Sequence, residues 1–211
     1  MKSDKTTPVR LWGAVVVAAV LWFVMFSPWT APRVNFWYTM TFSAVVLTTL
    51  ATLSCRECVT TLRFTLGQIV AGVAIAAVLW AVFWVGDKVS QLMFSFARPE
   101  VDMIYGMKTG TDPTVVGLLL LLIIGPAEEL FWRGFVQRGL SARWGADAAF
   151  AVTLVLYTVI HMWAFNVMLL LAALVVGGCW GFLYRLRPQA LPALIVSHAV
   201  WDVCAFVLFP F

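Results

Sequence analysis

Five acidic and basic side chains lie inside apolar stretches of the sequence, where lipid or protein would surround them. The chain has two histidines, His161 and His198, and both fall in such stretches. Asp202 comes one helical turn after His198, and Glu128 and Glu129 are neighbours in a third stretch. An ionisable side chain at membrane depth costs at least ~2.5–3.5 kcal/mol. Because placing them there is costly, we expect these residues to form a functional site.

The positions of the two glutamates predict separate roles for them. Glu129 and Arg133 are i and i+4 on a helix, so they share a face and can form an ion pair. Glu128 points about 100° away from Glu129, because successive helical residues are rotated by that angle. We expect Glu129 and Arg133 to support the structure, and Glu128 to face a cavity and exchange protons.

The same helical spacing recurs around each histidine. His198 and Asp202 are i and i+4, so the Asp202 carboxylate is placed to orient the imidazole. Tyr157 and His161 repeat this spacing, which gives Tyr157 a supporting position. The alternative is a buried polar network that only holds helices together. Because the set is spread over three apolar stretches, we favour a functional site.

A Gly125-Pro126 pair directly before the glutamates predicts a break in their helix. At 1.5 Å per residue, Glu128 lies about 21 Å from the outer membrane face and His161 about 20 Å from the inner face. In a hydrocarbon core of ~30 Å, these depths differ by about 11 Å. We expect a kinked or re-entrant segment at Gly125-Pro126 to line a water-filled cavity near the midplane.

The composition assigns the elements that carry these residues to a membrane. Hydrophobic residues make up 63% of the 211, charged residues 11%, and the mean hydropathy is +0.95, which excludes an ordinary water-soluble domain. We predict an all-α bundle of about seven transmembrane helices in one domain, 1–211, with N-terminal spans and an amphipathic loop in 1–113 and the catalytic helices in 114–211. The predicted spans are Leu11–Phe26, Phe36–Leu53, Leu66–Val85, Thr114–Trp132, Ala148–Trp163, Val167–Tyr184 and Ala190–Phe209.

The basic residues predict the orientation of the bundle. They gather at alternate connections, which by the positive-inside rule puts the N-terminus in the cytoplasm. This topology, with anionic lipid, accounts for the net charge of +4 without a nucleic-acid partner. The first span follows a basic segment like that of a signal peptide, but no Ala-x-Ala site follows it, so we expect it to be retained. The predicted inner residues are Lys2, Lys5, Arg10, Arg56, Arg63, Arg138, Arg143, Arg185 and Arg187.

Two further segments have a structural interpretation and a functional one. Cys55 and Cys58 form a Cys-x-x-Cys without a second pair, so we expect reduced thiols at a helix end in preference to a metal site.

The long loop 86–113 contains Lys88–Arg98, which can form a short helix on the bilayer surface. We favour a loop packed on the outer rim over a substrate gate.

Three short motifs resemble those of the CAAX protease and bacteriocin-processing family, also called the Abi family. The family pattern is Glu-Glu-x-x-x-Arg, then Phe-x-x-x-His, then His-x-x-x-Asn/Asp. The chain has these blocks in order, and the resemblance covers about 117–204. Tyr157 stands where the family more often has Phe, and Asp202 stands where the eukaryotic prenyl-protein proteases have Asn. The matching blocks are Glu128-Glu129-Leu-Phe-Trp-Arg133, Tyr157-Thr-Val-Ile-His161 and His198-Ala-Val-Trp-Asp202.

The resemblance implies an intramembrane endopeptidase of the glutamic type. In that reading Glu128 takes a proton from a water shared with His161, and His198 with Asp202 stabilises the oxyanion. No cofactor is expected. A zinc site formed by His161, His198 and Glu128 is the rival, because two histidines and a carboxylate make an open catalytic site, although the His-Glu-x-x-His motif of ordinary zincins is missing.

Two other classes of protein stay open alongside the protease. One is a noncatalytic membrane scaffold or regulatory protein of the same fold, against which the intact Glu/His set argues. The other is a proton-coupled transporter, disfavoured because no inverted repeat stands out. The expected partners are a membrane-associated protein or peptide substrate and the lipid bilayer, and a small chain with short loops fits a bacterial cytoplasmic membrane.

Overall fold

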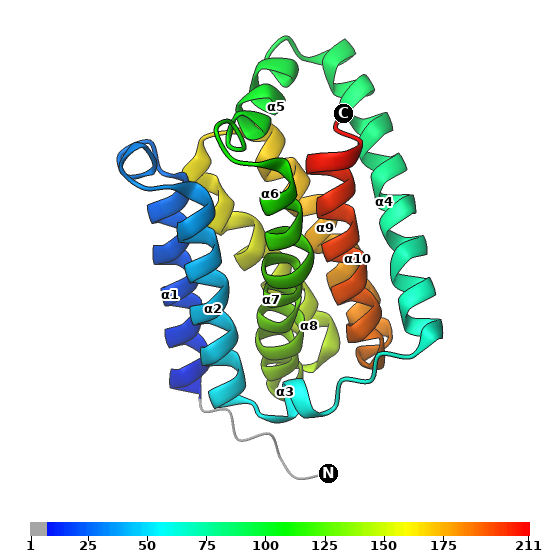
Figure 1. Cartoon of the computed structure of the whole chain (residues 1–211). Helices are drawn as coiled ribbons and strands as arrows, with labels where there is room; N and C mark the ends of the chain where they lie inside the picture. The colour runs from blue at the N-terminus through cyan, green and yellow to red at the C-terminus, as the bar shows by residue number, and fades with distance from the viewer. Residues whose placement is uncertain (1–7) are drawn as a thin grey trace.

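The computed structural model describes residues 8–211 as a bundle of helices (Figure 1), and this part of the chain contains no strand. The predicted inner residues Lys2 and Lys5 lie outside the described residues. The α-helices are α1 (Pro8–Phe26), α2 (Phe36–Ser54), α3 (Glu57–Thr60), α4 (Leu66–Met93), α5 (Ala97–Gly106), α6 (Pro113–Leu119), α7 (Gly125–Glu129), α8 (Arg138–Val159), α9 (Val167–Leu186) and α10 (Leu191–Val203).

Long apolar helices dominate the bundle, and six stretches of the described chain have the length and composition to cross a membrane. One of them, Pro113–Ala164, has 52 residues, or about 78 Å of helix, which is more than twice the ~30 Å core. It is divided at Gly145, whose φ of 81° and ψ of 166° are not helical. Two spans therefore lie within it. The prediction of an all-α membrane bundle of about seven spans is confirmed.

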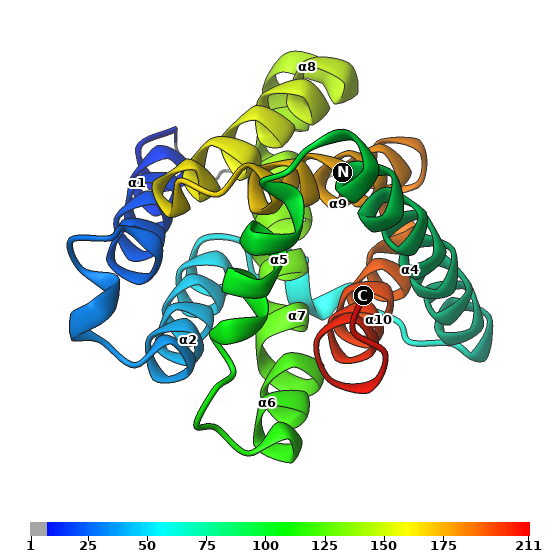
Figure 2. The ribbon, with the colours of Figure 1, turned by 90° about the horizontal axis from the view of Figure 1, so that it is seen from above.

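Two glycines let α10 closely approach its neighbours α4 and α7, between which it lies (Figure 2). A Cβ on Gly72 of α4 would lie 2.5 Å from the carbonyl oxygen of Ala193, and a Cβ on Gly125 of α7 would lie 2.8 Å from the Cα of Ala199. Neither distance leaves room for a methyl group. Because Ala199 is the neighbour of His198, the contact at Gly125 sets the distance between the two helices that carry Glu128 and His198.

The helix containing the glutamates is continuous through Gly125-Pro126, so the predicted helix break and re-entrant turn are wrong. Both Ile124 and Gly125 have helical backbone angles. Instead, π-helical segments precede and follow α7, at Leu120–Ile124 and Leu130–Gln137. A wider π turn accommodates a residue that disturbs the i to i−4 bonding without breaking the helix.

The segment 86–113, expected to be a long loop, contains more helix than its sequence predicts. The α4 helix runs on to Met93 instead of ending at Val85, and the rest of the loop folds as α5. Asp87 is 5% exposed and accepts hydrogen bonds from Lys88 at 3.1 Å and Gln91 at 2.6 Å, which compensate its charge within the helix. The predicted surface helix Lys88–Arg98 is therefore replaced by the end of α4 and the start of α5.

Cys55, directly after α2, and Cys58, within α3, form a disulfide bond, so the expectation of reduced thiols is wrong. Cys55 and Cys58 have Cα atoms 5.5 Å apart, which is within the normal range for a disulfide. Both side chains are buried, and the bond closes the turn between α2 and α3.

The close contact at Gly125 predicts a packing cost for any larger residue. Gly125→Ala places a methyl group against the backbone of α10, and overpacking of this kind costs about 1–3 kcal/mol. Gly178→Ala in α9 is the matched control, because a Cβ there meets nothing within 4 Å. We expect thermal unfolding in detergent to show a lower melting temperature for Gly125→Ala alone. Equal melting temperatures would contradict the packing described here.

Candidate active site

A cavity of about 420 Å³ lies in the middle of the bundle and contains the polar residues singled out by the sequence. Glu128 from α7, His161 from the segment after α8, and His198 and Asp202 from α10 all line it. Their exposed fractions are between 4% and 8%. Tyr157 of α8 lines the same cavity. The structure thus brings together residues that are up to 74 positions apart, Glu128 to Asp202.

Glu129 lies below the cavity at the centre of an ion-pair network. Its Oε1 accepts a hydrogen bond from Arg133 Nη1 at 2.8 Å, as the i and i+4 spacing predicts. The same oxygen lies 2.9 Å from His198 Nδ1. Glu129 and Arg133 are at most 1% exposed, and Arg133 also donates to the Gly177 carbonyl at 3.1 Å. Glu129 therefore holds the histidine as well as the arginine.

Glu128 is held by a partner on a different helix. The Tyr157 hydroxyl donates to Glu128 Oε2 at 3.0 Å. Tyr157 precedes His161 by one turn, and its backbone oxygen lies 2.7 Å from His161 Nδ1. The tyrosine therefore connects Glu128 to His161.

His161 has its hydrogen-bonding state fixed by its two neighbours. The Tyr157 carbonyl can only accept, so Nδ1 carries the hydrogen. The indole N–H of Trp22 can only donate, and it lies 3.1 Å from Nε2, which must accept. His161 is thus a neutral imidazole whose free lone pair is directed at Trp22. Trp22 comes from α1 and was missed in the sequence, where nothing distinguishes it from the other ten tryptophans.

His198 is fixed on three sides. Glu129 accepts from its Nδ1, the Trp180 ring stacks on the imidazole with centroids 3.9 Å apart, and Asp202 Oδ2 lies 3.6 Å from its Nε2. The last distance is within ion-pair range and longer than a hydrogen bond. Nε2 therefore faces the cavity with Asp202 beside it. Trp180 is fully buried and itself donates to Ser197 at 3.0 Å, which holds the stacked ring in place.

A zinc ion does not fit these residues as they are arranged. A metal needs a lone pair from each histidine, and the one on His161 accepts the Trp22 hydrogen bond. Among residues 8–211, no three His, Cys, Asp or Glu side chains are grouped to hold a metal. The Nδ1 of His198 is bound to Glu129, so only its Nε2 faces the cavity.

The fold and the cavity define a multi-pass membrane protein with an enclosed acid–base site. Residues 110–204, a little under half of the chain, match the family model described as Rce1-like, type II CAAX prenyl endopeptidase Rce1-like. The family resemblance is therefore confirmed over this region. The family indicates intramembrane proteolysis of the CAAX type. The matched region contains all seven site residues named from the sequence. No curated protein and no solved structure matches the chain.

The network around Glu129 predicts a large loss of stability when its carboxylate is removed. Glu129→Ala leaves Arg133 and His198 without their buried partner, and breaking a buried ion pair costs about 3–5 kcal/mol. The control is Asp147→Ala, whose carboxylate is 80% exposed and pairs with Arg185, because exposed pairs contribute about 0–1 kcal/mol. Denaturant or thermal unfolding in detergent measures both. Equal losses would contradict a central role for Glu129.

Proposed function

We propose that the chain is an intramembrane endopeptidase of the glutamic type that hydrolyses a peptide bond of a membrane-associated protein or peptide. One observation carries the proposal. Glu128, held by Tyr157 through one oxygen, shares a cavity with His198, which Glu129 fixes through the far ring nitrogen. Attack by water on a carbonyl requires a proton acceptor and a positioned N–H donor, and this cavity contains both.

In the proposed reaction, Glu128 removes a proton from a water molecule as the water oxygen attacks the carbonyl carbon of the scissile bond. The negative charge that develops on the carbonyl oxygen is stabilised by a hydrogen bond from His198 Nε2. Because Nδ1 already donates to Glu129, a hydrogen on Nε2 as well makes His198 the imidazolium form, which the carboxylates of Glu129 and Asp202 on its two sides favour. Glu128 then passes its proton to the leaving nitrogen as the C–N bond breaks, so the carboxylate is regenerated.

His161 is proposed to position the attacking water. Its Nε2 lone pair accepts the Trp22 hydrogen bond in this structure, and a water bound between Glu128 and His161 replaces the indole as the donor. No cofactor enters the proposed reaction.

The proposed setting is the cytoplasmic membrane of a bacterium, with the N-terminus in the cytoplasm. The arginines near α3, at the α8 kink and after α9 all lie at the α1 N-terminal end of the bundle (Figure 1), which supports this orientation. The partners are a membrane-associated substrate and the bilayer. A prenylated peptide with a C-terminal CAAX sequence is the first substrate to test, because the matched family is described by that substrate.

The proposal predicts that cleavage depends on three side chains and on no metal. Glu128→Gln, His161→Ala and His198→Ala each remove one group of the mechanism, so we expect each to abolish cleavage of a membrane-anchored peptide. Chelator should leave the wild-type rate unchanged. Product formation by the purified protein in detergent or liposomes measures both effects.

Each outcome of this assay separates one alternative. Full activity of Glu128→Gln would contradict the glutamic mechanism, and loss of activity with chelator that zinc restores would assign a metal site. A cellular phenotype that all three variants preserve would point to a noncatalytic scaffold. Melting temperatures of the variants exclude simple unfolding as the cause of lost activity.

Tyr157→Phe tests the orientation of the base separately. The substitution keeps the ring and removes the hydroxyl that holds Glu128 Oε2. Hydrogen bonds to charged groups contribute about 1.5–3 kcal/mol, so we expect kcat/KM to fall by roughly 10- to 100-fold without a complete loss. Tyr38→Phe, on an exposed tyrosine of α2, should keep the wild-type value. An unchanged kcat/KM in Tyr157→Phe would contradict a role of the Tyr157 hydroxyl in orienting Glu128.

A further inference from the structure

The cavity is closed toward the α3 end of the bundle. Below Glu128, the π-helical segment contributes Phe131, Trp132, Phe135 and Gln137, and all are at most 1% exposed. None of these four lines the cavity. About 15 Å of helix separates Glu128 from Arg138, where this segment reaches the α3 end. A substrate has no passage through this packed layer.

The cavity extends from the site toward the other end of the bundle. Its wall there includes Asp87 and Ser90 of α4, and Ile104 and Tyr105 of α5. The α5 helix lies across the top of the bundle (Figure 2) and is tied to its neighbours on several sides. Glu100 accepts from Asn166 and from the Met168 backbone N–H.

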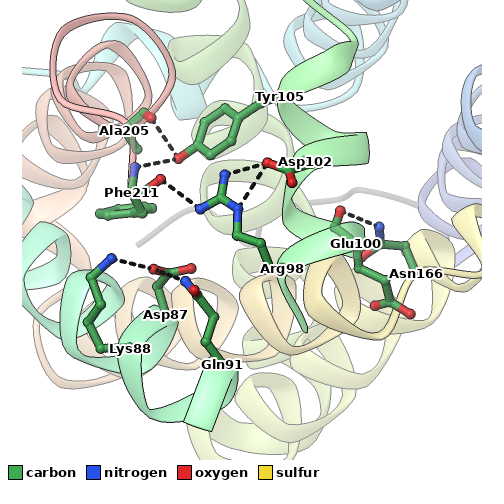
Figure 3. A network of polar contacts seen from close by, with 10 residues as sticks. All are labelled: Asp87, Lys88, Gln91, Arg98, Glu100, Asp102, Tyr105, Asn166, Ala205 and Phe211. Atoms are coloured by element: carbon green, nitrogen blue, oxygen red, sulfur yellow. Dashed lines mark hydrogen bonds and ion pairs between the residues drawn. The ribbon is translucent and has the colours of Figure 1, made fainter. Parts of the chain in front are cut away.

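Further contacts hold α5 to the C-terminal end of the chain (Figure 3). Arg98 donates to the Phe211 carbonyl at 3.1 Å, and Tyr105 donates to the Ala205 carbonyl at 3.0 Å. Arg98 also donates to Asp102, and this hydrogen bond lowers the pKa of the Asp102 carboxyl. The cavity therefore has a fixed roof and a closed floor.

The remaining way in is lateral, between α4 and α9 beneath α5. Val82 of α4 and Leu171 and Val175 of α9 all line the cavity, and they are also 43–48% exposed on the outside of the bundle. Side chains that contact both the cavity and the exterior mark an opening. The exterior here is the apolar, lipid-facing surface of two spans.

The cavity that this passage enters has two polar atoms without partners. Asp87 and Trp201 line the cavity, and each has one buried polar atom, Oδ1 and Nε1, that lacks a hydrogen-bond partner in the described chain. One is an acceptor and the other a donor, and an extended peptide backbone carries both complementary groups. Buried polar groups without partners are costly, so a ligand that satisfies them gains affinity.

We infer that the substrate is a membrane-inserted polypeptide segment that enters laterally between α4 and α9 from the leaflet at the α5 end, which is the non-cytoplasmic leaflet in the proposed orientation. The inference rests on the proposed function, because it assumes that the segment is cleaved after it enters. It deepens that function, because it selects peptides anchored on the outer side of the membrane over peptides presented from the cytoplasm.

A matched pair of substitutions tests the passage. Val175 lines the cavity and Leu174 does not, although both are similarly exposed, at 43% and 44%. Val175→Trp narrows the opening without touching the proposed catalytic residues, so we expect kcat/KM for an anchored peptide to fall by roughly 10-fold. Leu174→Trp should retain the wild-type value. Equal values for the two variants would overturn the lateral passage.

The side of entrance is tested with an acylated peptide confined to the outer leaflet of sealed vesicles. Thiol labelling of Thr109→Cys and Thr61→Cys, at the α5 and α3 ends, reports the orientation of the protein in the vesicles. We expect cleavage only where the α5 end faces the peptide, and cleavage from the α3 side would overturn the inference.

A photoreactive version of the same peptide tests entrance independently of cleavage. With the Glu128→Gln variant, cross-links at α4 and α9 from the α5 side support the inference. If the wild type forms these cross-links and cleaves nothing, the proposed function fails and the passage stands. Cross-links confined to other helices would overturn the passage.

Discussion

The site depends on one buried carboxylate that two cationic or N–H-donating side chains share. Glu129 binds Arg133 and His198 through the same oxygen, in a part of the bundle that excludes water. Separating any of these groups would leave a charge or an N–H in an apolar surrounding, which is far more costly than the pairing itself. The position of His198 relative to the α7 helix is therefore fixed by electrostatics as well as by packing.

Arg133 extends this constraint to the other helices around the cavity. Its guanidinium donates to the Gly177 carbonyl of α9 and lies 5.0 Å from the Tyr157 ring and 5.6 Å from the Trp180 ring. Tyr157 holds Glu128, and Trp180 stacks on His198. One ion pair thus contacts the two side chains, Tyr157 and Trp180, that hold Glu128 and His198. Close helix contacts at small residues, such as Gly125 against α10, make the arrangement compact enough for these contacts.

Hydropathy and helical spacing predicted the fold and part of the site. Spans follow from the length of apolar runs, and the Glu129–Arg133 pair follows from their i and i+4 positions, because both are local properties of the chain. The contact of His198 with Glu129 joins residues on different helices, so the spacing favoured Asp202 as the partner in its place. The contact of Trp22 with His161 also joins residues on different helices, so helical spacing could not predict it.

Predictions from local sequence were wrong about where α4 ends and about a helix break at Gly125-Pro126. The charged residues after Val85 suggested a loop, but Lys88 and Gln91 both donate to one oxygen of Asp87 within a continuing helix. Gly125-Pro126 suggested a break, but the helix continues, with π turns on both sides of α7. In both places the deciding contacts form only in the folded chain, and they shape the roof and the wall of the cavity.

The most direct test of a single assembled site is a double-mutant cycle on catalysis. It compares kcat/KM of Glu128→Gln, His198→Gln and the double variant on one anchored peptide. Groups that act together on one bond are strongly non-additive, so the account predicts that the double variant is scarcely slower than either single variant. Losses that multiply independently would contradict a site in which Glu128 and His198 act on the same carbonyl.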